Sequence, residues 1–105
     1  MPRNHLYRLE PDNVLVLDVQ ADILDTLNTR VVVPLLPKSD APAPARFLNP
    51  MFTIDGMAHV MVTQFLTAVS VQQLSEPVGD LDACFAEITR ALDTLLQGGL
   101  NSQGW

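Results

Sequence analysis

The sequence has few of the residues on which catalytic or metal-binding proteins depend. It contains one cysteine, Cys84, and two histidines, His5 and His59, among 105 residues. A single cysteine excludes an internal disulfide and is typical of proteins in a reducing compartment. These three possible ligands are scattered along the chain without the short paired spacing of zinc sites. We therefore expect no metal site and no cofactor.

Positive charge is also scarce, because six Lys and Arg residues accompany twelve Asp and Glu residues, for a formal net charge of −6. An acidic surface repels phosphate and disfavours direct binding to DNA or RNA. Asp, Arg and Pro interrupt the apolar segments before any reaches the length of a membrane span. Residues 1–6 lack the unbroken apolar stretch of a signal peptide, so we expect a cytoplasmic protein.

The length of 105 residues fits one domain, and a content of 48% hydrophobic residues is too high for a disordered tail. Small domains bury roughly two-thirds or less of their unfolded surface, so self-association would add stability. We expect a homo-oligomer.

Apolar segments of period two predict an antiparallel sheet. We expect strands at residues 6–9, 14–20, 31–33, 51–54, 58–62 and 69–71. Pro34 has no N–H group and is predicted to end the strand at 31–33. Asp55-Gly56 lies between two apolar segments and predicts a hairpin turn. Five of the eight prolines lie between Pro34 and Pro50, so residues 37–45 are expected to form an extended surface loop.

The C-terminal part changes to helical period. Apolar residues recur at spacings of three and four at Leu81, Phe85, Ile88, Leu92, Leu95 and Leu96. This pattern predicts a helix over residues 81–96, with Asp80 as N-cap and Gly98 as C′ residue. The fold class expected is mainly β with one C-terminal α-helix.

The candidates for catalysis are weak. Asp18, Asp22 and Asp25 could form paired carboxylates, but turn and cap hydrogen bonds explain their positions more simply. Cys84 lies near the start of the predicted helix, where the helix dipole could lower a thiol pKa, yet its apolar neighbours favour a small buried hydrophobe. Gly98-Gly99 follows a helix and is too short for a phosphate-binding loop. We do not expect an enzyme.

Two segments resemble the CcdB family of toxins. Residues 17–26 read Leu-Asp-Val-Gln-Ala-Asp-Ile-Leu-Asp-Thr, and residues 30–35 read Arg-Val-Val-Val-Pro-Leu. Leu48-Asn49-Pro50, Val62-Thr63-Gln64 and the final helix follow in the same order, so the resemblance covers residues from about 5 to 99. It implies a twisted antiparallel sheet that forms a small Src-homology-like barrel, in a two-fold homodimer. The toxin domain would span residues 1–99, followed by a C-terminal extension at 100–105.

The resemblance also implies a function without catalytic residues. Toxins of this family bind the A subunit of DNA gyrase, a type II topoisomerase, and hold the enzyme on cleaved DNA. A CcdA-like antitoxin neutralises them, and such toxin–antitoxin systems serve plasmid maintenance. The turn at Asp12-Asn13 and the loop at 37–44 are the exposed candidates for the antitoxin surface, and the sequence does not choose between them.

In the family, the residues after the helix are commonly Trp-Gly-Ile and engage gyrase. A gap-free continuation places Gln97, Gly98 and Gly99 at these positions, so only the central glycine agrees. Losing an aromatic platform for an arginine would remove on the order of 1–2 kcal/mol per site.

The resemblance gives the remaining contact positions a better match. Ile23 and Leu24 match an apolar pair beside the same tip, while Leu96 replaces an aromatic residue and Asp93 an amide. Trp105, the single tryptophan, lies in a polar, glycine-rich tail and is either an additional binding anchor or a terminal residue without a role.

Three functions therefore stay open. The first is a gyrase poison that an antitoxin neutralises, with Trp105 as a possible extra contact. The second is a CcdB-like dimeric binding module that binds an antitoxin but has lost gyrase poisoning or has another target. The third, an enzyme, has the least support because no catalytic constellation is present.

Overall fold

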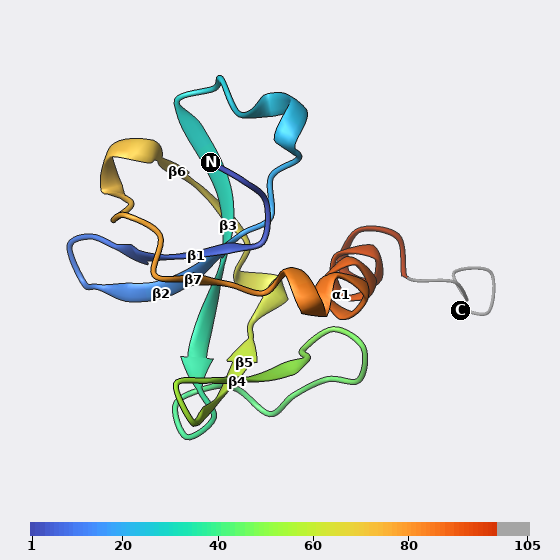
Figure 1. The fold of residues 1–105 in the computed structure, drawn as a ribbon. Coiled ribbons are helices and arrows are strands. Elements are labelled where there is room, and N and C mark those ends of the chain that lie inside the picture. Colours follow the sequence, from blue (N-terminus) through green and yellow to red (C-terminus); the bar gives the residue numbers. More distant parts are fainter. Residues whose placement is uncertain (99–105) are drawn as a thin grey trace.

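A computed structural model describes residues 1–98, which form a curled antiparallel sheet with one helix beside it (Figure 1). The strands are β1 (His5–Leu9), β2 (Val14–Asp18), β3 (Thr29–Pro37), β4 (Met51–Ile54), β5 (Met57–Met61), β6 (Thr67–Ser70) and β7 (Gly79–Asp80). The α-helix is α1 (Phe85–Gln97), and short 3-10 turns occur at η1 (Asp22–Leu24), η2 (Thr63–Phe65), η3 (Val71–Gln73) and η4 (Asp82–Cys84). The sheet curls into a half-barrel, which confirms the predicted mainly β fold with one C-terminal helix.

The long strand β3 organises the sheet, whose strand order is β4-β5-β3-β2-β1-β7. On one side β3 pairs with β2, and on the other it pairs first with β6 and then with β5. The prediction that Pro34 ends this strand is therefore wrong, since β3 continues to Pro37. The carbonyl of Pro34 accepts the N–H of Val62 (3.0 Å) where β3 passes from β6 to β5. A proline at this change of partner interrupts neither ladder.

The ends of β2 and β6 also differ from the prediction. β2 ends at Asp18 instead of residue 20, because the Asp18 side chain accepts the N–H of Gln20 and turns the chain away from the sheet. The strand expected at 69–71 is β6, which stops at Ser70, where the Ser70 hydroxyl accepts the Gln72 N–H and begins η3. Strand β7 was not predicted, because Gly79-Asp80 has no apolar alternation and pairs with β1 through tertiary contact alone.

The helix begins four residues later than its apolar spacing predicts. Asp80 does not cap α1, since its carboxylate accepts the N–H of Asp82 (3.1 Å) and starts η4 instead. Cys84 occupies the N-cap position, and Gly98 ends the helix in a left-handed conformation with φ 73°. The prediction for Gly98 is confirmed, because glycine takes this conformation without the steric penalty of a Cβ atom.

The main core lies between α1 and one face of the sheet. Ile88 and Ala91 on α1 are fully buried there, and the strands contribute Leu6, Leu15, Leu17, Val33, Leu35, Phe52 and Met61. A smaller cluster on the other face contains Tyr7, Val16 and Val32. Successive side chains of β2 point alternately into the two clusters, so both faces of this strand are buried. The hairpin between β4 and β5 turns at Asp55 and Gly56, both with positive φ, as the Asp-Gly pair predicts.

Within residues 1–98, no helix is long and apolar enough to cross a membrane.

Candidate protein-binding site

An apolar groove of about 540 Å³ separates the η1 segment from the last turns of α1. Three of the residues singled out by the sequence line it together: Leu24 from η1, and Asp93 and Leu96 from α1. The other lining residues are Arg3, Val19, Gln20, Ala21, Leu27, Thr29, Val31, Leu66, Thr89 and Leu92. The structure therefore brings the two separate sequence segments of the predicted site into one place.

Large aliphatic side chains are exposed around this groove. Ile23 is 87% exposed and Leu96 70%, while Leu24 and Leu27 are about half exposed. We call these four residues the tip. Ile23 does not line the groove and instead projects from η1 beside Leu24. Exposed apolar groups that gather at one place on a small protein are typical of a protein-binding surface.

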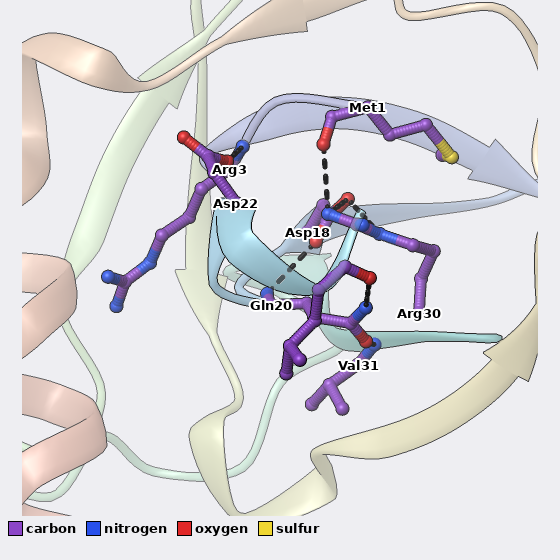
Figure 2. A network of polar contacts seen from close by, with 8 residues as sticks. Met1, Arg3, Asp18, Gln20, Asp22, Arg30 and Val31 are labelled. Carbon is purple, nitrogen blue, oxygen red and sulfur yellow. Dashed lines mark hydrogen bonds and ion pairs between the residues drawn. The ribbon is translucent and has the colours of Figure 1, made fainter. Parts of the chain in front are cut away.

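Residues 21–29, which we call the tip segment, carry three of the four tip side chains. The tip segment has no core packing of its own, because each of its residues is exposed. A buried ion pair holds the segment on both sides instead, as Figure 2 shows. The Nη2 atom of Arg30 lies 2.7 Å from Oδ2 of Asp18, and neither side chain is exposed to solvent. Arg30 Nη2 also donates to the carbonyl oxygen of Met1 (2.9 Å), so the N-terminus is tied to the same pair.

Gln20 connects the ion pair to the tip. Its N–H donates to Oδ1 of Asp18 (3.0 Å), and its Nε2 donates to the carbonyl of Leu24 (2.9 Å). Its Oε1 accepts the N–H of Val31 at the start of β3 (3.1 Å), as Figure 2 shows. The backbone of Leu24 is thus fixed relative to both strands that flank the segment, so little conformational freedom remains to be lost on binding.

The three aspartates have separate roles. Asp18 makes the predicted turn hydrogen bond to Gln20, but the sequence did not reveal its ion pair with Arg30. Burial raises the pKa of the Asp18 carboxyl, while the Gln20 N–H and the Arg30 guanidinium act in the opposite direction. Asp22 accepts the N–H of Arg3 (2.7 Å), and Asp25 ends η1 with its N–H bonded to the Asp22 carbonyl. The predicted turn hydrogen bond is therefore confirmed for Asp18 alone, because the Asp22 bond joins residues 19 positions apart and η1 has no side-chain cap.

The last residues of α1 complete the site. Gln97 is exposed where the resemblance implies an aromatic residue, and Gly98 follows it as the helix cap. Gly99 and Trp105, which were also predicted to contact gyrase, lie outside the described residues. Leu27 and Leu92 are groove residues that we did not single out. In the sequence, Leu27 stands out only as an isolated leucine between polar Thr26 and Asn28. Leu92 is part of the apolar stripe that predicts the helix.

The cysteine and histidines occupy different surroundings. Cys84 is half-buried against the core, and burial together with the nearby Glu87 raises its thiol pKa, which favours the interpretation as a small hydrophobe. His5 lies beside Asp80 and Asp82, with potential ligand atoms within 4.8 Å of one another, because β7 pairs with β1. Asp80 already accepts a backbone hydrogen bond, and both carboxylates are exposed. The absence of a metal site stays a prediction.

Residues 1–98 thus form a small β protein, a half-barrel with one α-helix, in which the aliphatic side chains of the tip are exposed beside a groove. The sequence model of the CcdB protein family matches residues 3–98. The chain therefore belongs to the CcdB family, as the resemblance implied. Membership in this family indicates a toxin of a toxin–antitoxin pair.

Proposed function

We propose that the protein is a type II toxin that binds the A subunit of DNA gyrase as a homodimer and is neutralised by a CcdA-like antitoxin. The observation that carries the proposal is the tip, where Ile23, Leu24 and Leu96 are exposed beside the end of α1. These are the residues at which the family resemblance implies a gyrase contact, and they converge although some 70 residues separate them in the sequence.

The physical basis of binding is burial of aliphatic surface by a segment that is already ordered. Fully burying one large aliphatic side chain contributes about 1.5–3 kcal/mol. A two-fold dimer would present the tip twice, and two linked contacts strengthen binding beyond either one. Inhibition in this proposal needs no catalytic residue, because the toxin acts by holding gyrase on cleaved DNA.

A second function is favoured by the residues at the end of α1. Gln97 provides an amide where the family commonly has a tryptophan, so the tip lacks an aromatic surface at that position. A CcdB-like binding module that binds an antitoxin without trapping gyrase is consistent with this difference. Gyrase trapping therefore has to be measured directly.

Expression in a gyrase-competent host without antitoxin tests the proposal. The wild-type chain should arrest growth and accumulate cleaved gyrase–DNA complexes, and Ile23→Asp should abolish both effects by placing a charge in the contact. Met57→Asp is the matched control, since Met57 is 55% exposed in the β4–β5 hairpin and should leave toxicity unchanged. Wild-type toxicity in the Ile23→Asp variant would contradict the gyrase contact at the tip.

Two further outcomes separate the remaining alternatives. If the wild-type chain binds an antitoxin but traps no gyrase, the binding-module function replaces the first proposal. Deleting residues 100–105 tests Trp105, because unchanged toxicity would remove the proposed contribution of the extension.

A further inference from the structure

A second exposed surface, which adjoins the tip groove along α1, carries two arginines on this acidic protein. The guanidinium carbon of Arg90 lies 3.9 Å from the centroid of the Phe47 ring, and that of Arg46 lies 4.6 Å from the same centroid. Phe47 is 41% exposed, and both arginines are exposed. We call these three residues the arginine stack. It joins the loop before β4 to α1.

No carboxylate among the described residues forms an ion pair with either arginine of the stack. Within residues 1–98, Arg30 and Asp18 form the single ion pair. Glu87 and Asp93 lie one turn before and after Arg90 on α1, yet Arg90 contacts the Phe47 ring instead of pairing with either carboxylate. Two cations near one ring repel each other, and anionic groups bound to them would relieve this repulsion.

Stacking leaves the arginines ready to bind an anion. A guanidinium contacts an aromatic ring through its flat face, so its N–H groups remain directed outward in the plane of the group. Those N–H groups match the two oxygens of a carboxylate in a bidentate arrangement. The ring thus orients Arg90 without using its hydrogen-bonding capacity.

The loop that carries Phe47 is held in one conformation. Phe47 has φ 65°, which a non-glycine residue adopts only when its surroundings impose it. The buried Asn49 accepts the N–H of Ala45 (2.9 Å) and donates to the Met61 carbonyl (3.0 Å) and to Gln64 Oε1 (2.7 Å). These bonds fix the turn that presents Arg46 and Phe47 toward α1.

We propose that the arginine stack is a docking site for an acidic peptide segment of a partner protein, whose carboxylates bind Arg46 and Arg90. A peptide fits better than a nucleic acid, because the net charge of −6 and the flanking Glu87 and Asp93 repel a continuous phosphate backbone. The site goes beyond the proposed function, since it uses other residues than the gyrase contact at the tip.

Binding of labelled synthetic peptides to the full chain, followed by fluorescence anisotropy at low and physiological salt, tests the proposal. The chain should bind a short peptide with adjacent glutamates and should not bind the same peptide with glutamines. Arg90→Gln and Arg46→Gln should each weaken binding about tenfold, because each removes a charge-assisted hydrogen-bonded pair. Lys38→Gln, which removes the same charge from the same loop, should leave the affinity nearly unchanged.

The proposal would be overturned if Lys38→Gln weakened peptide binding as much as the arginine variants, or if the arginine variants did not weaken it. Tighter binding of a single-stranded oligonucleotide than of the peptide would also overturn it. Phe47→Gly provides a second variant, because glycine tolerates φ 65° and both charges remain. Affinity should still fall severalfold, since the ring no longer orients the guanidinium groups. Ile23→Asp should bind the peptide normally, so failure of the gyrase proposal and failure of this site are distinguishable.

Discussion

Two irregular segments of this protein are built alike and present opposite chemistry. The η1 segment between β2 and β3 is held by the buried Asp18–Arg30 pair, and the loop before β4 is held by the buried Asn49. The first presents exposed aliphatic side chains at the tip, whereas the second presents the arginine stack. One buried polar anchor can thus order a loop whatever that loop displays, so the displayed side chains are free to specify different partners.

The Asp18–Arg30 pair is charged and Asn49 is neutral. We therefore expect that disrupting them lowers the free energy of unfolding by different amounts. A buried charge that loses its partner cannot be solvated, whereas a neutral amide that is removed leaves only ordinary polar groups unpaired. The comparison therefore predicts that the tip segment depends more strongly on its anchor than the loop before β4.

Arg30→Met should have the largest effect. It leaves the Asp18 carboxylate buried without its cationic partner and should lower the free energy of unfolding by about 3–5 kcal/mol. Urea denaturation followed by circular dichroism measures this loss. The double variant Asp18→Asn with Arg30→Met contains no buried charge at this place and should recover much of the stability. A double variant as unstable as the single one would show that the charge is not the cause.

Asn49→Ala should have an intermediate effect. It leaves the Ala45 N–H and the Met61 carbonyl without their partner and should cost about 1–3 kcal/mol by the same measurement. The binding assays distinguish the two segments, because this variant should weaken binding of the acidic peptide while leaving growth arrest intact. Loss of toxicity with normal peptide binding would reverse the assignment of the two segments.

Gly98→Ala should have the smallest effect. Gly98 ends α1 with φ 73°, and a Cβ atom in this conformation costs about 1–2 kcal/mol. The strain is confined to the helix end beside Leu96, so toxicity should decrease slightly and peptide binding should not change. Thermal unfolding with a parallel growth assay measures both, and an equal effect on the two binding sites would show that they are coupled through α1.

Local patterns in the sequence were sufficient for most of the fold. Period-two segments located the hairpins, the Asp55-Gly56 turn was correctly identified, and the apolar stripe predicted α1 with its end at Gly98. The errors fall where a distant segment intervenes. Pro34 continues a strand because β3 changes partners there, and Asp80 lies in β7 instead of capping α1 because β7 pairs with β1.

The candidate site was predictable only in part, for the same reason. Ile23, Leu24 and Leu96 were chosen through a family resemblance, and the structure places Leu24 and Leu96 around one groove. The groove residue Leu27 and the anchor Arg30 were not identified, because an isolated leucine and an arginine beside a strand have no periodic signature. The stack of Arg90 on Phe47 joins positions more than 40 residues apart and has no sequence motif.

The sequence by itself determined the alternation of the strands, the amphipathic helix, the acidic character and the family. These properties depend on neighbouring residues, whose spacing sets which face of an element is apolar. Only the tertiary structure decided that Arg30 neutralises Asp18 and that Leu24 lies across a groove from Leu96. It alone also decided that Arg46 and Arg90 both stack on Phe47. Such contacts depend on strand register and on the packing of a helix against the sheet, which bring together residues that are distant in the chain.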